Sequence, residues 1–153
     1  MTTQIRNIGA MIAVLRAAAN TAATAGGSGD NTAVTGVILD RAAYGFPQSG
    51  VVAIPFTATL AAGETLSIGC TVQEGDASNL SDAATLVTAA SAVVATGPGG
   101  GGTVTGTFEL DLSLAGAGRY VRANFTPDLS AANTDTAALS AVFVFGGSDR
   151  LPQ

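Results

Sequence analysis

The chain contains a stretch, from Thr103 to Pro127, in which polar and apolar side chains alternate over almost the whole length. From Thr103 to Leu114 the odd positions are polar, whereas the even positions are apolar or glycine. This two-residue period is that of a β-strand with one solvated face and one buried face. The alternation returns from Arg119 to Phe125 after a short Ala/Gly segment, and Pro127 ends it because proline cannot donate to a strand ladder. The spacing predicts a β-hairpin with an ordinary turn length.

Further segments show the same period. Residues 51–60 and 65–73 alternate on either side of a turn at 61–64, which predicts a second hairpin. Pro55 inside the first of them predicts an edge strand or a bulge. Residues 35–40 and 139–145 are also predicted strands, whereas 83–96 is compatible with a helix or a strand. This pattern predicts an all-β chain, folded as an antiparallel sandwich or a jelly-roll-like barrel with a short N-terminal arm or helix.

The apolar phase of these strands defines the predicted core. In the last strand we assign the buried face to Val142 and Val144 rather than to the alternate positions. The side chains that we expect to be mostly buried are Ile54, Phe56, Leu66, Ile68, Phe108, Leu110, Leu112, Val121, Phe125, Val142 and Val144.

Residues 1–25 have a different pattern from the rest of the chain. Four apolar side chains spaced three and four apart predict one face of a short helix: Ile5, Ile8, Ile12 and Leu15. A signal peptide also combines positive and apolar residues, but this apolar run is short and ends on Arg16. The run is also shorter than the roughly 20 apolar residues that cross a membrane. We therefore divide the chain into an N-terminal arm, helical or extended, at 1–25 and a single β-sandwich domain at 26–153.

The composition excludes several kinds of function. Only 11% of the residues are charged, and the net charge is −5. The chain has arginines but no lysine or histidine, so we expect no nucleic-acid partner, which would require clustered cations. The absence of histidine also removes the commonest general base. A weakly charged surface is typical of proteins that are covered by other protein, and it predicts an oligomer or a component of a larger particle.

Few residues are arranged as a chemical site. The acidic loop at 74–82 lacks the residue order of a calcium loop, and the glycine run at 97–102 lacks the Lys-Ser/Thr of a phosphate-binding loop. Glu109 and Asp111 lie two residues apart on one strand face, as in a paired-carboxylate hydrolase, but a solvated strand face is the simpler interpretation. Cys70 is expected to be a buried small side chain. We expect no enzyme activity, no cofactor and no metal.

The last third of the chain resembles a known group of proteins. Residues 118–130, continuing through 134–137 to 146–152, resemble small virion proteins encoded near the capsid gene of tailed bacteriophages, and so does the acidic segment that begins at 72–76. The resemblance covers roughly residues 35–152 and leaves out the N-terminal arm. In that group, head decoration or cement proteins are jelly-roll or sandwich domains that lie as oligomers on the outer capsid and clamp neighbouring capsomers.

The resemblance implies a role and partners. It implies a homo-oligomer, a dimer or a trimer, that binds the major capsid protein on the outer surface of a virion assembled in the host cytoplasm, without a membrane partner. The alternative is a tail or spike component that binds host surface glycan. Glycan sites stack sugars on aromatic side chains, and this chain has only two tyrosines, Tyr44 and Tyr120, and no tryptophan.

Two places are expected to make contacts with a sister subunit or the capsid. The apolar stripe of the arm is too short to be a stable helix alone, so we expect it to lie on another chain, and deletion of residues 1–20 to leave the β domain folded. On the non-core face of a strand, Arg122 lies near Tyr120, an arrangement suited to carboxylates of a neighbour. The predicted contact residues are Ile5, Arg6, Ile8, Ile12, Leu15, Arg16, Tyr120 and Arg122.

Overall fold

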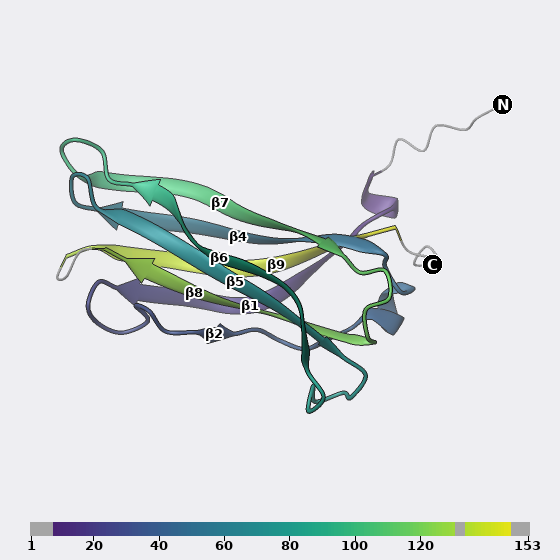
Figure 1. The fold of residues 1–153 in the computed structure, drawn as a ribbon. Coiled ribbons are helices and arrows are strands. Elements are labelled where there is room, and N and C mark those ends of the chain that lie inside the picture. Colours follow the sequence, from purple (N-terminus) through teal and green to yellow (C-terminus); the bar gives the residue numbers. More distant parts are fainter. Residues whose placement is uncertain (1–7, 131–133, 148–153) are drawn as a thin grey trace.

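The computed structural model describes residues 8–130 and 134–147, which form two antiparallel sheets (Figure 1). Sheet A contains, in spatial order, β1 (Ala13–Thr24), β9 (Thr136–Gly146), β4 (Ser49–Leu60) and β7 (Gly102–Ser113). Sheet B contains β2 (Val34–Thr35), β8 (Tyr120–Leu129), β5 (Thr65–Gly75) and β6 (Ala84–Thr96), and β3 (Leu39–Asp40) also pairs with β8. Two short 3-10 helices, η1 (Ile8–Ala10) and η2 (Arg41–Tyr44), complete the described elements. The predicted all-β antiparallel sandwich is confirmed.

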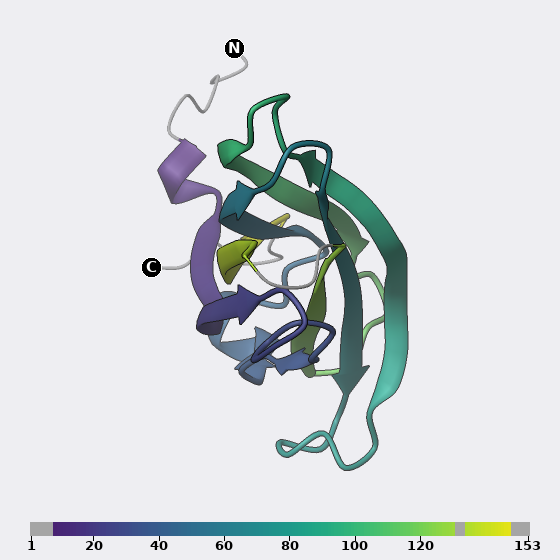
Figure 2. The same cartoon turned by 90° about the vertical axis from the view of Figure 1, so that its left-hand side faces the viewer.

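Successive long strands mostly alternate between the two sheets. β4 pairs with β7 and β9, whereas the following strand, β5, pairs with β6 and β8. The chain crosses again from β7 to β8 and from β8 to β9. Because β2 and β3 pair with successive parts of β8, they occupy one strand position. Within the described residues the result is two face-to-face sheets of four strand positions each, the architecture of a double-sheet jelly roll (Figure 2).

Both predicted hairpins are wrong, although their strands are present. The turns at 115–118 and 61–64 each lead from one sheet to the other instead of joining two hydrogen-bonded neighbours. Alternation specifies which side chains face the core, but not which strand is the neighbour. A hairpin does form between β5 and β6. The ambiguous segment 83–96 is therefore a strand, and the single strand predicted at 35–40 is divided into β2 and β3.

A buried arginine holds the loop that leads from β7 to β8. The Arg41 side chain is only 2% exposed. Its guanidinium donates to the carbonyls of Pro47, Leu114 and Gly118, each at 2.8 Å, and to that of Ala117. Burial lowers the pKa of Arg41, because the charged form loses hydration. Since the accepting carbonyls belong to the loops before β4 and after β7, this one side chain ties the two loops together at one end of the sandwich.

Most of the predicted core is confirmed. The buried side chains of the core cluster include Ile54, Phe56, Leu66, Ile68, Leu112, Val121 and Phe125. Phe108 and Leu110 pack against this cluster but are only half-buried, because β7 is an edge strand of sheet A.

The last strand has the opposite phase from the predicted one. Ala141, Phe143 and Phe145 are buried, whereas Val142 and Val144 lie half-exposed on the outer face of sheet A. Both phases of β9 are apolar, so alternation does not distinguish them. The aromatic rings bury the larger apolar area and therefore take the core side.

The N-terminal segment is a strand from Ala13 onward, not a helix. β1 pairs with β9 over its length and contributes buried alanines to the core, although the predicted boundary placed it in the arm. Of the stripe expected to form a helix, Ile5 lies outside the described residues, Ile8 is in η1, and Leu15 is in β1. Deletion of residues 1–20 would remove most of β1, so from the structure we expect it to destabilise the sandwich instead of leaving it folded.

Pro55 lies in a central strand, so the predicted edge position is wrong. β4 has β7 on one side and β9 on the other, and Pro55 is opposite Thr107 of β7. The pairing of β4 with β9 is interrupted between the Ala53–Val142 and Phe56–Leu139 pairs. The missing N–H of proline therefore falls where the ladder is open.

Candidate interaction surface

The outer face of sheet A carries a patch of apolar side chains that lie in cross-strand rows. One row runs from Val14 of β1 through Val144 of β9 and Val51 of β4 to Asp111 of β7. The next outward-facing row runs from Arg16 through Val142 and Ala53 to Glu109. We call the apolar centre of these two rows the valine patch; it consists of Val14, Val51, Ala53, Val142 and Val144. None of these side chains is buried in the core, and Val14 is 60% exposed.

The charges of sheet A lie at opposite edges of this face. β4 and β9, the two central strands, have no charged residue. Arg16 is on the β1 edge, whereas Glu109 and Asp111 are on the β7 edge. All three side chains are exposed. The face is therefore an apolar strip with one cation on one side and two carboxylates on the other.

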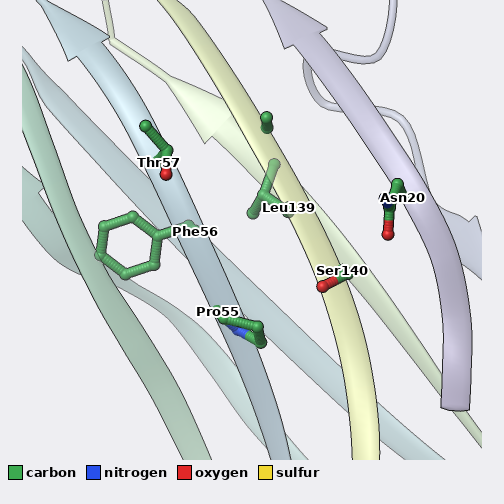
Figure 3. A pocket seen from close by; sticks show the side chains of 7 residues that line it. Asn20, Pro55, Phe56, Thr57, Leu139 and Ser140 are labelled. Carbon is green, nitrogen blue, oxygen red and sulfur yellow. The ribbon is translucent and has the colours of Figure 1, made fainter.

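Two hollows lie along the same face. The first, of about 370 Å³, adjoins the valine patch and is lined by Ile12, Val51, Asp111, Val144 and neighbouring residues. The second, of about 250 Å³, lies where the strand pairing is open at Pro55, with Asn20 and Ser140 on the neighbouring strands (Figure 3). A register shift in the pairing of β1 with β9 falls between Ala18 and Thr21, on either side of Asn20, which lines this hollow. Neither hollow encloses a cluster of polar side chains that would hold a small ligand in a fixed orientation.

The predicted contact residues of the arm divide between the surface and the core. Ile5 and Arg6 lie outside the described residues. Ile8 is exposed, and Ile12 lines the larger hollow. Leu15 packs against the core cluster of its own chain. Arg16 is exposed, and its Nε donates to the carbonyl of Ala18. Because side chains alternate along a strand, Ile12 and Leu15, which were expected on one helix face, lie on opposite faces of sheet A.

The other predicted pair lies on a different sheet. Arg122 is half-buried on the outer face of sheet B, and its guanidinium donates to Gln73 Oε1 at 3.2 and 2.7 Å. The same oxygen accepts from Asn124 Nδ2 at 2.8 Å. Tyr120 lies beneath the guanidinium of Arg119, which is 5.2 Å from the ring centroid. Arg122 is therefore part of an internal hydrogen-bond network, and the structure does not bring it together with the arm.

The carboxylates of the loop at 74–82 are used by the protein backbone. Asp82 accepts hydrogen bonds from the N–H groups of Asp76 and Ala77, and the first of these bonds is the main cause that lowers the pKa of Asp82. Glu74 accepts from the N–H of Gly118. These bonds order the loop against the start of β8. Asp82 and Glu74 therefore bind backbone N–H groups, which is a structural role and not that of calcium ligands.

The described residues offer few groups for catalysis. Among residues 8–130 and 134–147, no three acidic, cysteine or histidine side chains lie close enough together to hold a metal ion. Cys70 is buried, and this burial raises its pKa to about 11, so its thiol stays protonated at neutral pH. Glu109 and Asp111 point from an exposed edge strand. No helix in the described part of the chain is long and apolar enough to cross a membrane.

Sequence reasoning missed the valine patch. Its members come from three strands that are far apart in the chain, and only the pairing of β9 between β1 and β4 brings them into rows. A usable signal was present, because β4 and β9 are strands without charge on either face. A sheet whose central strands lack charge on the solvent side predicts a covered surface.

Comparisons with known proteins found likeness only among solved structures. No protein-family model matches the chain, and no curated protein matches it. A structure of infectious bursal disease virus, Gx strain, matches with 12% identity, 92% of this chain covered and a TM-score of 0.47. The VP2 subviral particle of the same virus gives the same values. The K3 adhesin domain of Lys-gingipain from Porphyromonas gingivalis matches at 17% identity and a TM-score of 0.37, over 74% of this chain and 63% of that domain.

The viral matches cover only part of the viral proteins. The chain spans about a third of their length, 34% in both cases.

Proposed function

We propose that this chain is a structural protein of a tailed-phage virion, which decorates the outer capsid by bridging major capsid protein subunits. The observation that carries the proposal is the outer face of sheet A, where an apolar strip crosses the sheet and its two central strands have no charge. Apolar surface of this extent is typical of proteins that work inside an assembly. Double-sheet jelly rolls recur in viral capsids, and the resemblance at residues 118–130 supports the same role.

We expect the contact with the capsid shell to lie at the start of the described chain, just before β1. Ile8 and Met11 are exposed apolar side chains that immediately precede β1 at the edge of the sandwich, Met11 being 42% exposed. They lie outside the strand ladder, so a partner can cover them without disturbing the sandwich. Arg122 is not proposed as a shell contact, because its guanidinium is held by Gln73.

A tail or spike protein that binds neutral host glycan is the second candidate. The observation that favours it is a shallow hollow of about 460 Å³ on the outer face of sheet B. Its polar lining consists of hydroxyl and amide side chains without charge: Thr71, Thr88, Ser91, Asn124 and Thr126. Hydroxyl and amide groups can bind sugar hydroxyls, but the lining contains no aromatic ring on which a sugar would stack.

Rebinding to undecorated particles tests the capsid role. Purified protein is mixed with particles that lack it, and the bound copies are counted after co-sedimentation. We expect saturable binding at a fixed ratio to the major capsid protein, and Met11→Asp to weaken it at least tenfold. Val37→Asp is the matched control, because Val37 is 46% exposed but lies between β2 and β3. Binding that is absent, or equally weakened by both variants, contradicts the proposal.

A further inference from the structure

We propose that two copies of this chain pack face to face through sheet A, about a two-fold axis that runs parallel to the strands between β9 and β4. The contact is isologous, so the same surface is buried on both copies. This inference does not depend on the virion role, because the dimer is a property of the isolated protein. Three observations carry it: the positions of the charges, the positions of the valines and the size of the face.

Under this rotation, the charges of one copy face opposite charges of the other copy. Arg16 and Glu109 occupy the two ends of one cross-strand row, at the β1 edge and the β7 edge. A two-fold axis along the strands exchanges the two edges and keeps each row in place. It therefore sets Arg16 of one copy against Glu109 of the other, and the symmetry makes this ion pair twice. Asp111, in the neighbouring row, adds a second carboxylate on the same side as Glu109.

The apolar side chains of one copy also contact the apolar side chains of the other. The rotation exchanges β9 with β4, so Val144 of one copy lies over Val51 of the other, and Val142 lies over Ala53. Small branched and unbranched apolar side chains pack well between aligned sheets, which stack about 10 Å apart. The valine patch thus becomes the apolar part of the contact, toward one end of the strands, with the ion pairs at its two edges.

The face is large enough for a stable dimer. Four strands of 11 or 12 residues make up sheet A. With about 4.8 Å between strands and about 3.3 Å per residue, the sheet presents roughly 700 Å². A standard stable interface buries about 800 Å² on each partner. The face of this sheet alone therefore supplies close to the required area, and Ile12 at its margin adds to it.

Charge reversal and charge exchange test the arrangement. Sedimentation velocity between about 1 and 200 μM gives the dissociation constant of the full chain and of Arg16→Glu, Glu109→Arg and the double variant. We expect a wild-type dimer, at least a tenfold weaker association for each single variant because two like-charge contacts form, and recovery to within threefold in the double variant. Circular dichroism spectra establish that each variant is folded.

Two further variants separate the face from the edge of the sandwich. Val14 and Val93 are 60% and 59% exposed, but Val14 lies in the valine patch whereas Val93 lies on β6, the edge strand of sheet B. We expect Val14→Asp to weaken the dimer and Val93→Asp to leave it unchanged. A monomer or a trimer at 200 μM overturns the proposal. So does a double variant that fails to recover, or a dimer lost only with Val93→Asp, which would assign the contact to β6 pairing.

Discussion

The guanidinium of Arg41 donates a hydrogen bond to the carbonyl of Leu114 at 2.8 Å, from a side chain that is almost fully buried. Leu114 ends the run of alternating residues that leads to the crossing from sheet A to sheet B. The bond therefore fixes the point at which the chain leaves one sheet for the other. Its companions to Pro47 and Gly118 place the loops before β4 and before β8 around the same cation.

We call these hydrogen bonds from Arg41 to the loop carbonyls the Arg41 clamp, and Arg41→Met tests its contribution to stability. Methionine keeps most of the side-chain volume but donates no hydrogen bond, so several carbonyls at the end of the sandwich lose their partner. We expect the free energy of unfolding to fall by about 1–3 kcal/mol, the usual range for leaving a buried polar group unsatisfied. Urea unfolding followed by circular dichroism measures it. Arg122→Met is the control, because Arg122 is half-buried and its bonds reach one side-chain oxygen; a loss as large as that of Arg41→Met would contradict the account.

The phase of β9 predicts a large difference between two adjacent positions. Phe143 is fully buried, so Phe143→Ala is expected to cost about 3–5 kcal/mol of unfolding free energy. Val144 is half-exposed on the valine patch, so Val144→Ala in the monomer is expected to change stability by less than about 1 kcal/mol. Urea unfolding at low protein concentration compares them. Equal costs at the two positions would mean that the strand phase is wrong.

The strands were predictable from the sequence, but their partners were not. Alternation located β4, β5, β7 and β8 because one face of each is apolar, and the apolar run of β9 located that strand without specifying its buried face. It contains no information on the neighbour across the ladder, and the short turns at 61–64 and 115–118 have lengths that suit a hairpin as well as a crossing. The choice between them depends on contacts such as the Arg41 clamp, in which one side chain meets carbonyls more than 70 residues away in the chain.

The candidate surface could be predicted only in part. Of the arm residues expected to make contacts, the structure places Ile12 and Arg16 at one edge of the valine patch or beside it, whereas Ile8 is exposed in η1. Two members of the patch, Val142 and Val144, were assigned to the core, because the face of β9 that is buried could not be told from its apolar pattern. The Arg16–Glu109 row requires the order β1-β9-β4-β7, which no local pattern specifies.

Acid is expected to weaken the fold through Asp40. The hydrogen bond from the Arg119 guanidinium, with an ion-pair distance of 2.7 Å, lowers the pKa of the Asp40 carboxyl. A carboxyl with a lowered pKa in the folded state stabilises the protein above about pH 4, its usual unfolded value, and this contribution is lost as the pH falls through the folded pKa. The urea midpoint should therefore drop between pH 5 and pH 3 by less in Asp40→Asn than in the wild type. Glu109→Gln, on an exposed edge strand and measured at a protein concentration at which the chain is monomeric, is the control, and a wild-type-sized drop in Asp40→Asn would contradict the assignment.

Cys70 is expected to be chemically silent in the folded protein. Its thiol is buried in the core, and its raised pKa of about 11 leaves little thiolate at pH 8. A thiol-reactive chromophore should therefore label the native protein at least a hundredfold more slowly than the urea-unfolded chain, with one equivalent bound at the end. Rapid labelling under native conditions would show that β5 opens or that the thiol is accessible.

Imaging of purified particles tests the virion role most directly. Cryo-electron microscopy of particles from a phage that encodes this chain, with mass spectrometry of the same preparation, locates and counts the copies. We expect density for the two-sheet sandwich on the outer surface of the capsid shell, with the start of β1 directed toward the major capsid protein. Absence of the chain from washed particles, or its presence only in the tail, would contradict it.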